Sequence, residues 1–270
     1  MAKVNKGAKA ARTAAADARA QAQAAERARD RKVRTLGGIG VLVVMGGLLF
    51  IGIKSNTSAI NGPVANAALP KGVSKDTFGI PVGSAWTAAN AESVPKLQLW
   101  EDFQCPACGD FETQVGPKLK ELVDAGKLKL EYRPTIFLDG NLSAQNSTAG
   151  NADSSLRATM ALGCAVDQGK AMEYHNAIFA LQPANEGDGY STASLTSAAS
   201  TAGIVDQGLA TFSDCLTKKT YKGWVYNSYD LFSKEGNTST PTGYLNGAEL
   251  TSDVLFDPVA LEKAITDATK

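Results

Sequence analysis

An uncharged apolar stretch divides this chain of 270 residues into two unequal parts. Residues 35–53 (TLGGIGVLVVMGGLLFIGI) contain no charged side chain. A helix of this length is long enough to cross the roughly 30 Å hydrocarbon core of a bilayer. The sequence therefore predicts a transmembrane helix over 35–53 and leaves only the residues after it to form a sizeable globular domain.

The charges around this segment are strongly asymmetric. The formal net charge is zero, yet residues 1–34 carry ten Lys or Arg against three acidic residues. By the positive-inside rule, such a tail stays in the cytoplasm and the chain after the span lies outside. We predict a single-pass protein of the cell membrane with an extracytoplasmic globular domain.

Two other interpretations of the N-terminal region stay open. Ala65-Asn66-Ala67 has the A-x-A pattern of signal-peptide cleavage, although it lies about a dozen residues past the apolar core. The basic, Ala-rich tail is also compatible with binding nucleic acid or anionic lipid. It has no interleaved aromatic residues, so we expect no nucleic-acid partner.

The first part of the globular region predicts the order strand, helix, strand. Polar and apolar residues alternate in 96–100 (KLQLW) and again in 128–132, which is typical of strands. Between these runs, apolar residues recur at helical spacing, and a Gly-Pro pair predicts a kink. The helical residues are Phe111, Val115, Leu119 and Leu122, and the pair is Gly116 and Pro117.

The second part predicts mostly helices, then a hairpin and a closing helix. Helical spacing recurs within 141–235, which we interpret as an inserted helical subdomain. Thr242–Leu245 and the Asn246-Gly247 turn predict a β-hairpin. Asp257 followed by Pro258 predicts the start of the last helix.

The predicted organisation follows from these segments. It comprises a cytoplasmic basic tail (1–34), the membrane span (35–53), a linker (54–75), an α/β domain (76–140 with 236–270) and the insertion (141–235).

Cys105 and Cys108 are separated by Pro106 and Ala107 and follow the first predicted strand. A disulfide between them would close a very small loop and add little stability, so exchange chemistry is the better explanation for the pair. At a helix N-terminus, free N–H groups and the helix dipole favour a thiolate. We therefore predict Cys105 as the nucleophile and Cys108 as the resolving thiol.

Other interpretations of this pair are a structural disulfide or half of a zinc site. A tetrahedral zinc site needs further close ligands, and the sequence offers none beside its one histidine, His175. We predict no metal and no organic cofactor, and expect His175 to be a packing or surface residue.

Cys164 and Cys215 both fall in the predicted helical region. A bond between them would close a loop of about fifty residues, worth on the order of 4 kcal/mol in the chain-entropy model. We predict a structural disulfide; the competing hypothesis is a second redox pair that passes electrons to a partner.

Three segments together resemble the DsbA-like branch of the thioredoxin superfamily. They are LQLWEDFQCPACGDFE (97–112), LGCAVDQGKAMEYHNAIFA (162–180) and STPTGYLNG (239–247). The resemblance covers about residue 76 to the C-terminus and implies a thioredoxin-like fold with a helical insertion. It also implies a cis peptide bond before Pro241, with Thr240 and Pro241 beside the cysteines and binding extended substrate chain.

The sequence departs from the family at one chemically important position. Thioredoxins hold a buried acid six residues before the first cysteine, and Leu99 stands there. Glu101 and Asp102 lie close by, but we expect them to face solvent or cap local structure. The general acid or base is therefore unassigned at this stage.

The resemblance implies an oxidase that donates disulfides to exported, unfolded proteins with free thiols. It further implies reoxidation by a quinone-linked membrane partner similar to DsbB or to bacterial vitamin K epoxide reductase homologues. The alternatives are a reductase or isomerase, for example in cytochrome c maturation, and a non-catalytic binding module on a thioredoxin scaffold. We expect a monomer.

Overall fold

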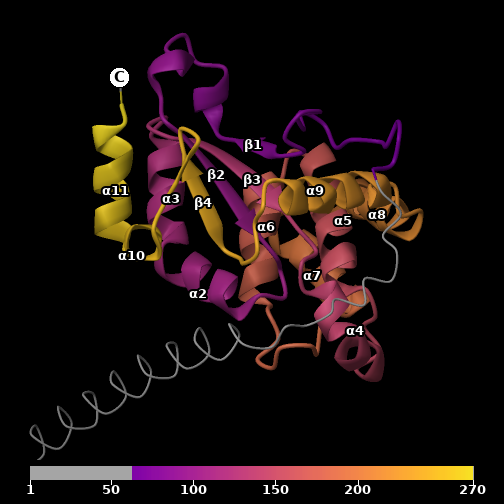
Figure 1. Ribbon diagram of the computed structural model, residues 1–270. Helices are drawn as coiled ribbons and strands as arrows, with labels where there is room; N and C mark the ends of the chain where they lie inside the picture. The colour runs from indigo at the N-terminus through magenta and orange to yellow at the C-terminus, as the bar shows by residue number, and fades with distance from the viewer. Residues whose placement is uncertain (1–62, 270) are drawn as a thin grey trace, which may run out of the picture. The chain divides into compact units, whose positions relative to one another are not determined.

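The computed structural model describes residues 63–269, so the predicted tail and membrane span lie outside the described residues (Figure 1). Within 63–269, every helix is too short or too polar to cross a bilayer. The described chain is a mixed α/β structure built on a five-stranded sheet with strand order β1-β3-β2-β4-β5.

The central strands are β2 (Lys96–Glu101) and β3 (Lys129–Pro134), which pair in parallel. Edge strand β1 (Ile80–Val82) runs antiparallel to β3, and β4 (Thr242–Leu245) runs antiparallel to β2. Both central strands are buried along nearly their whole length. The two strands predicted in the first part of the globular region are therefore the middle of the sheet.

The connection between β2 and β3 is a helix that breaks once. Helix α2 (Pro106–Gln114) is followed by the cap residue Val115, and α3 (Gly116–Asp124) begins directly after it. Pro117 cannot donate a backbone hydrogen bond within the helix, which accounts for the break at the position where the sequence predicts a kink. Phe111, Leu119 and other apolar residues of this pair are buried in the core.

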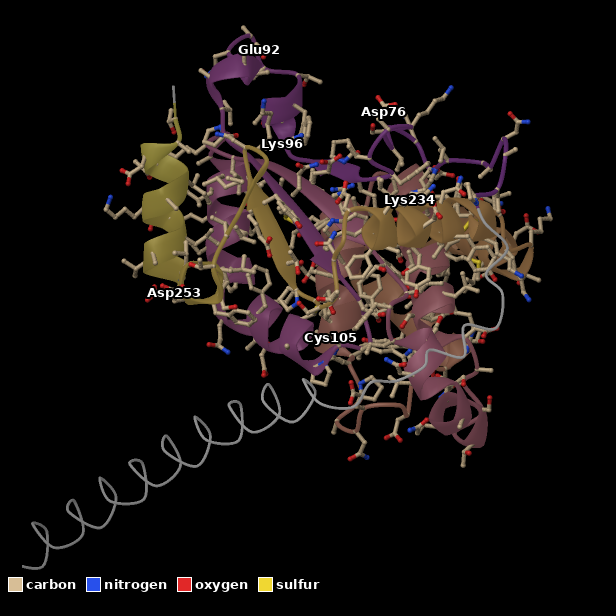
Figure 2. The ribbon with its side chains drawn as sticks, in the orientation of Figure 1. Asp76, Glu92, Lys96, Cys105, Lys234 and Asp253 are labelled. Carbon is tan, nitrogen blue, oxygen red and sulfur yellow. A yellow bond between two sulfur atoms is a disulfide. The ribbon has the colours of Figure 1, made fainter. Side chains whose placement is uncertain are left out.

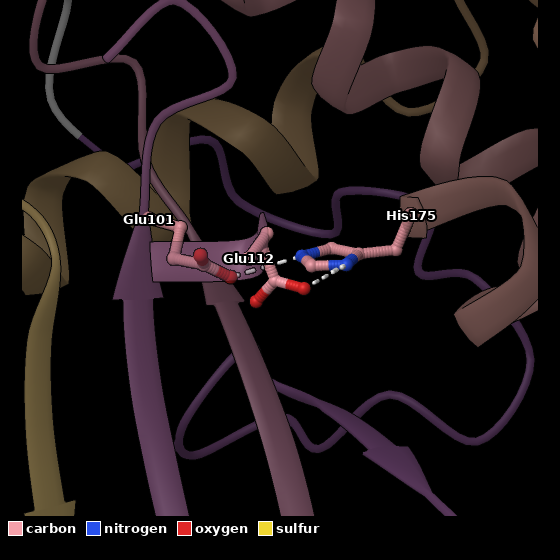
Figure 3. A group of neighbouring side chains, drawn as sticks. All are labelled: Glu101, Glu112 and His175. Atoms are coloured by element: carbon pink, nitrogen blue, oxygen red, sulfur yellow. Dashed lines mark hydrogen bonds and ion pairs between the residues drawn. The ribbon is translucent and has the colours of Figure 1, made fainter. Parts of the chain in front are cut away.

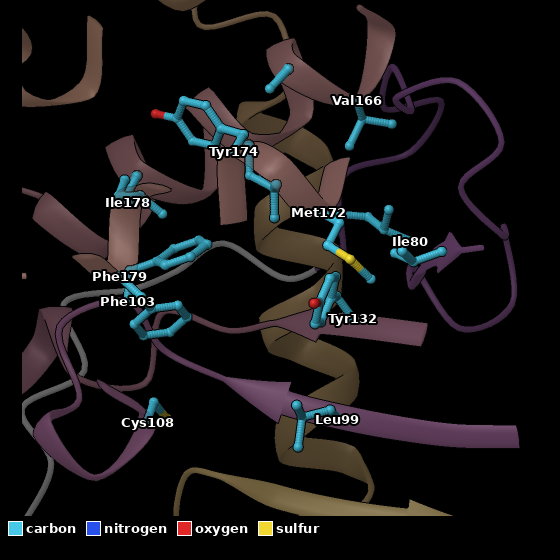
Figure 4. Packing of buried hydrophobic residues seen from close by; sticks show 14 of the residues in the cluster. Ile80, Leu99, Phe103, Cys108, Tyr132, Val166, Met172, Tyr174, Ile178 and Phe179 are labelled. Atoms are coloured by element: carbon cyan, nitrogen blue, oxygen red, sulfur yellow. The ribbon is translucent and has the colours of Figure 1, made fainter. Parts of the chain in front are cut away.

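Six helices occupy residues 139–234, close to the predicted insertion. They are α4 (Asp139–Thr148), α5 (Ser154–Asp167), α6 (Ala171–Ala180), α7 (Thr192–Thr201), α8 (Asp206–Thr217) and α9 (Lys222–Lys234). Figure 1 shows α5 to α9 gathered on the β1–β3 side of the sheet, with α11 on the β4 side. Their buried residues form one continuous cluster with the sheet (Figure 4). Their division from the sheet as a separate subdomain stays a prediction.

The chain ends with a hairpin and two helices. Strand β5 (Ala248–Glu249) pairs with β4, and Asn246 and Gly247 in the turn between them have positive φ angles of 50° and 87°. Helix α10 (Ser252–Leu255) precedes α11 (Pro258–Asp267). The Asp257 side chain accepts hydrogen bonds from the N–H groups of Val259 and Ala260, so it caps α11 as its sequence position indicates.

The second half of the predicted linker packs onto the domain. Residues 64–73, here called the N-terminal strap, include Leu69 and Val73, which pack in the core. The amide group of Asn227 accepts from the Val64 N–H at 2.6 Å and donates to the Val64 carbonyl at 3.1 Å. Two spaced apolar residues and one distant amide thus hold the strap against the domain, and the linker boundary at residue 75 stays a prediction.

Candidate functional site

Cys105 is the N-cap residue of α2, directly after β2 delivers the chain to one end of the sheet. Figure 2 shows it at the end opposite to Lys96, where β2 begins. The Cys105 carbonyl accepts from the N–H groups of Cys108 and Gly109 at 3.1 and 3.2 Å. Pro106 occupies the first helical turn, where a missing N–H costs nothing. Both cysteines are unpaired thiols; Cys105 is 8% exposed and Cys108 is fully buried.

The environment of Cys105 favours its thiolate. A hydrogen bond from the Cys108 side chain lowers the pKa of Cys105 to about 7, although burial opposes this. The Thr240 side chain and the backbone N–H groups of Cys108 and Ala107 lower the pKa further. About half of the Cys105 thiols are therefore ionised near neutral pH.

Cys108 has the opposite character. Burial raises the pKa of the Cys108 thiol well above its usual value, and the neighbouring Cys105 thiolate raises it further. The two sulfurs therefore differ in reactivity: Cys105 is a partly accessible nucleophile, and Cys108 is a buried thiol that keeps its proton. This is the division expected of an attacking and a resolving cysteine.

Removing the Cys108 thiol will raise the pKa of Cys105. In Cys108→Ala the largest stabilising hydrogen bond is lost, so we expect the pKa to move from about 7 towards the usual value for cysteine, near 8.5. Cys108→Ser keeps a donor and serves as the matched control, with a smaller rise. The rate of iodoacetamide alkylation against pH measures both, and equal pKa values in Cys108→Ala and the wild type would contradict this assignment.

The loop before β4 lies against Cys105. The peptide bond between Thr240 and Pro241 is cis, and the Cys105 thiol lies 3.3 Å from the Thr240 carbonyl oxygen. Thr242, the next residue but one, pairs with Trp100 of β2. The structure therefore brings together Cys105, Cys108 and the loop residues that the sequence singled out.

An ion pair between buried Arg133 and partly exposed Glu235 anchors the start of this loop. Arg133 of β3 is 3% exposed and makes two hydrogen bonds to the Glu235 carboxylate, at 2.9 and 2.7 Å. Its guanidinium group lies 4.1 Å from the ring centroid of Trp100, whose indole N–H also donates to Glu235. The start of the loop is thus tied to the centre of the sheet.

Asp102 is fully buried, so it does not face solvent, and of the two expected roles only the capping of local structure fits. Its carboxylate accepts from the N–H groups of Gln104 and Leu138, both at 2.9 Å, and from the Ser155 hydroxyl at 2.6 Å. Burial raises the pKa of Asp102 to about 8, and nearby Asp139 contributes. The three hydrogen bonds offset only part of the desolvation of this carboxyl. They tie the cysteine loop to the start of α4 and to α5.

Glu101 is also buried, at 4% exposure, and the expectation that it faces solvent is wrong as well. It meets Glu112 and His175 in the interior (Figure 3). His175 Nε2 lies 2.9 Å from Glu101 Oε2, and Nδ1 lies 3.8 Å from Glu112 Oε2. His175 was expected to be either a packing or a surface residue, and it is buried. In addition to packing, its ring is hydrogen-bonded to Glu101.

These three side chains do not fit a metal ion well. The two carboxylates approach different nitrogens of the same imidazole ring, whereas an ion binds a histidine through one nitrogen. The arrangement is that of a hydrogen-bonded chain.

Two side chains from the helical region hold the cysteine loop in place. The Gln182 amide donates to the carbonyls of Phe103 and Cys105, both at 2.9 Å. The Tyr190 hydroxyl donates to the Phe103 carbonyl at 2.8 Å. No local pattern marks either residue, because each lies more than 70 positions from its partner.

Cys164 of α5 and Cys215 of α8 form a disulfide, with their Cα atoms 5.9 Å apart. The Cys164 side chain is buried in the core. This bond joins two helices of the α4–α9 region.

Comparisons with known proteins agree with this geometry. Residues 87–267 match the family described as thioredoxin. Among solved structures, the MdbA thiol-disulfide oxidoreductase of Actinomyces oris is 23% identical with a TM-score of 0.62, covering 77% of this chain and 97% of its own.

Two structures from Mycobacterium tuberculosis are also similar. The reduced disulfide bond oxidoreductase DsbG is 29% identical with a TM-score of 0.58, covering 70% of this chain and 86% of its own. Oxidised DsbA is 28% identical with a TM-score of 0.56, covering 71% of this chain and 92% of its own. No curated protein matches the sequence significantly. The matched segment spans two thirds of the chain and contains both free cysteines, so this chain belongs to the thioredoxin family and resembles its DsbA-type oxidoreductases.

Proposed function

We propose that this protein is a thiol:disulfide oxidoreductase that oxidises exported proteins through Cys105 and Cys108. One observation carries the proposal: a thiol with a pKa of about 7 sits at a helix N-terminus, beside a buried thiol that keeps its proton. The similarity to DsbA-type structures supports the same activity.

The reaction follows from the two sulfurs. A substrate thiolate attacks Cys105 Sγ of the oxidised pair, the Cys105–Cys108 bond breaks, and Cys108 leaves and takes a proton. A second substrate thiolate then attacks the substrate sulfur of the mixed disulfide and releases Cys105 as a thiolate. The substrate loses two electrons and gains a disulfide, and the enzyme is left reduced.

The lowered pKa of Cys105 favours this direction. A group that stabilises the thiolate stabilises the reduced enzyme, and a stable reduced form makes the disulfide a stronger oxidant. The cis-proline loop is positioned to hold an extended substrate strand beside Cys105, because Thr240 and Pro241 directly precede β4.

The proposed setting is the outer side of the cell membrane. The charge asymmetry about residues 35–53 supports a single-pass anchor with a cytoplasmic N-terminus. The substrates would be exported, unfolded proteins with free thiols. A quinone-linked partner similar to DsbB or to vitamin K epoxide reductase homologues would reoxidise the pair.

A reductase or isomerase is the second candidate, and Thr240 before Pro241 favours it, as some such members of the superfamily carry threonine there. The two are separated by incubating stoichiometric oxidised protein with reduced, unfolded ribonuclease and counting the disulfides formed. We expect rapid transfer of one disulfide per molecule. Failure to oxidise ribonuclease, with efficient reduction of insulin by the reduced protein, would favour the second candidate. A protein that carried out neither reaction would be a binding module.

A further inference from the structure

A cavity of about 270 Å³ lies among helices α5, α7 and α8 and the start of α9. Its walls include three cationic side chains and one acidic side chain, which are Arg157, Lys219, Lys222 and Asp153. Neither Cys105 nor Cys108 lines it. The volume is slightly below the range typical of sites for drug-sized ligands, so the cavity suits a smaller molecule.

The three cationic groups have no acidic partner. Arg157, Lys219 and Lys222 take part in no ion pair among residues 63–269. Lys218, the neighbour of Lys219, differs in this respect, because it pairs with Asp214 at 2.7 Å. A concave site with an excess of one charge attracts ligands of the opposite charge. The cavity is therefore suited to an anion.

Arg157 is held in place by neutral groups. Its two terminal nitrogens donate to the Tyr190 carbonyl at 3.1 Å and to the Thr192 hydroxyl at 2.8 Å. The side chain is half-buried, and buried Leu156 and Met160 line the same cavity. A guanidinium group with only neutral acceptors in a partly apolar setting lacks compensation for its charge. An anion in the cavity supplies this compensation to a group that is already oriented.

Lys219 occupies a backbone position that favours glycine. It follows α8 with a φ angle of 53°, and its N–H donates to the Leu216 carbonyl at 3.1 Å. Glycine is the usual residue where a helix ends in the left-handed conformation, because a side chain adds strain there. A contact between the lysine side chain and a ligand would explain why a strained residue stands at this edge of the cavity.

The hydroxyl groups of the cavity indicate what the anion is attached to. The Thr196 and Thr217 hydroxyls donate to the carbonyls of Thr192 and Ser213, at 2.9 and 2.8 Å. Their oxygen lone pairs remain for a donor from the ligand. A fully ionised phosphate group has no hydrogen to donate, whereas an alcohol group does. Together with the apolar side chain of Leu216, this favours an anion that carries a short hydroxylated carbon chain.

The number of cations favours phosphate over carboxylate. A phosphate monoester carries about −1.5 to −2 charges at pH 7 on three acceptor oxygens, so one such group can meet several cations at once. A carboxylate carries a single charge on two oxygens. Three cationic groups against one acidic group therefore match a phosphate monoester better than an acidic side chain of a peptide.

We propose that this cavity binds the phosphate monoester of a small polyol. The phosphate contacts Arg157, Lys219 and Lys222, and the polyol hydroxyls donate to Thr196 and Thr217. Binding involves no thiol, so this proposal goes beyond the proposed oxidoreductase function and does not depend on it.

The test is isothermal titration calorimetry of the full-length protein in a nonionic detergent, with glycerol 3-phosphate as the probe. We expect one saturable site per chain. Lys219→Gln/Lys222→Gln should weaken binding by at least about tenfold, because two charge-assisted hydrogen bonds are lost. Inorganic phosphate should bind the wild type about fivefold more weakly than glycerol 3-phosphate, because it does not bring the polyol hydroxyls.

Lys218→Gln/Lys234→Gln is the matched control. It removes the same charge from the protein, but these two lysines pair with Asp214 and Asp230 and do not line the cavity. The lysines of both variants are exposed, so neither change should affect folding. The Kd of the control variant should stay within about twofold of the wild-type value.

The proposal is overturned if glycerol 3-phosphate shows no saturable binding. It is also overturned if both double variants lose affinity equally, because that result indicates attraction to net charge alone. Inorganic phosphate that binds as tightly as glycerol 3-phosphate would contradict the role of the polyol. Tighter binding of dihexanoyl phosphatidylglycerol would replace the free ester with a lipid head group, and tighter binding of a hexaglutamate peptide would replace it with an acidic peptide.

Discussion

Replacing Cys105 with serine will abolish disulfide exchange, with a loss of at least about a thousandfold in rate. The hydroxyl of serine does not ionise near neutral pH, so the helix N-terminus and the Cys108 hydrogen bond have no nucleophile to activate. Buried Cys108 cannot take over, because its raised pKa and full burial keep it protonated and inaccessible. The rate of ribonuclease oxidation by the oxidised wild type and by the variant measures the loss.

The matched control is Cys108→Ser, which keeps the nucleophile and removes the resolving thiol. It should form a mixed disulfide with substrate, and this adduct should accumulate because nothing expels it from within the enzyme. Mass spectrometry after reaction with an activated substrate disulfide detects the adduct. If Cys105→Ser formed the adduct and Cys108→Ser did not, the assigned roles of the two cysteines would be reversed.

Replacing both Cys164 and Cys215 with alanine will lower the free energy of unfolding by about 4 kcal/mol. The bond joins residues 51 positions apart, and closing a loop of this length restricts the unfolded chain by roughly that amount. For a domain of this size, the loss corresponds to a fall in melting temperature of roughly 8–16 °C. Denaturant unfolding and thermal melts measure both quantities.

Cys105→Ser/Cys108→Ser is the control for this stability change. A bond between residues 105 and 108 would close only a very small loop, so removing both thiols should change the unfolding free energy far less. The Cys164→Ala/Cys215→Ala variant should still oxidise ribonuclease at a temperature where it is folded. Loss of exchange in the folded variant would instead support a second redox pair.

The order of secondary structure around the cysteines could be predicted from the sequence because its signals are local. Alternation in KLQLW, the Gly-Pro break after α2, the Asn-Gly turn and the Asp257 cap each act over a few residues, and each has its expected counterpart in the fold. The placement of Cys105 at a helix N-terminus follows from the same kind of signal.

The interior chemistry could not be predicted, because it depends on contacts between distant segments. Glu101 and His175 are 74 positions apart, and no pattern near either one indicates the other. Charged residues are normally exposed, so the sequence predicts Glu101 and Asp102 at the surface or as caps of local structure, and it does not indicate the distant partners that bury Glu101. Gln182 lies 77 positions from the Cys105 carbonyl that it holds, for the same reason.

The most direct test of the central claim is the equilibrium of Cys105 and Cys108 with glutathione redox buffers, followed by alkylation and mass spectrometry. The account predicts a reversible disulfide between these two residues, with a reduction potential nearer to DsbA's, about −120 mV, than to thioredoxin's, about −270 mV. The Cys164–Cys215 bond should stay closed throughout. If Cys105 and Cys108 formed no reversible bond at any glutathione ratio, or if either paired with Cys164 or Cys215, the account would be contradicted.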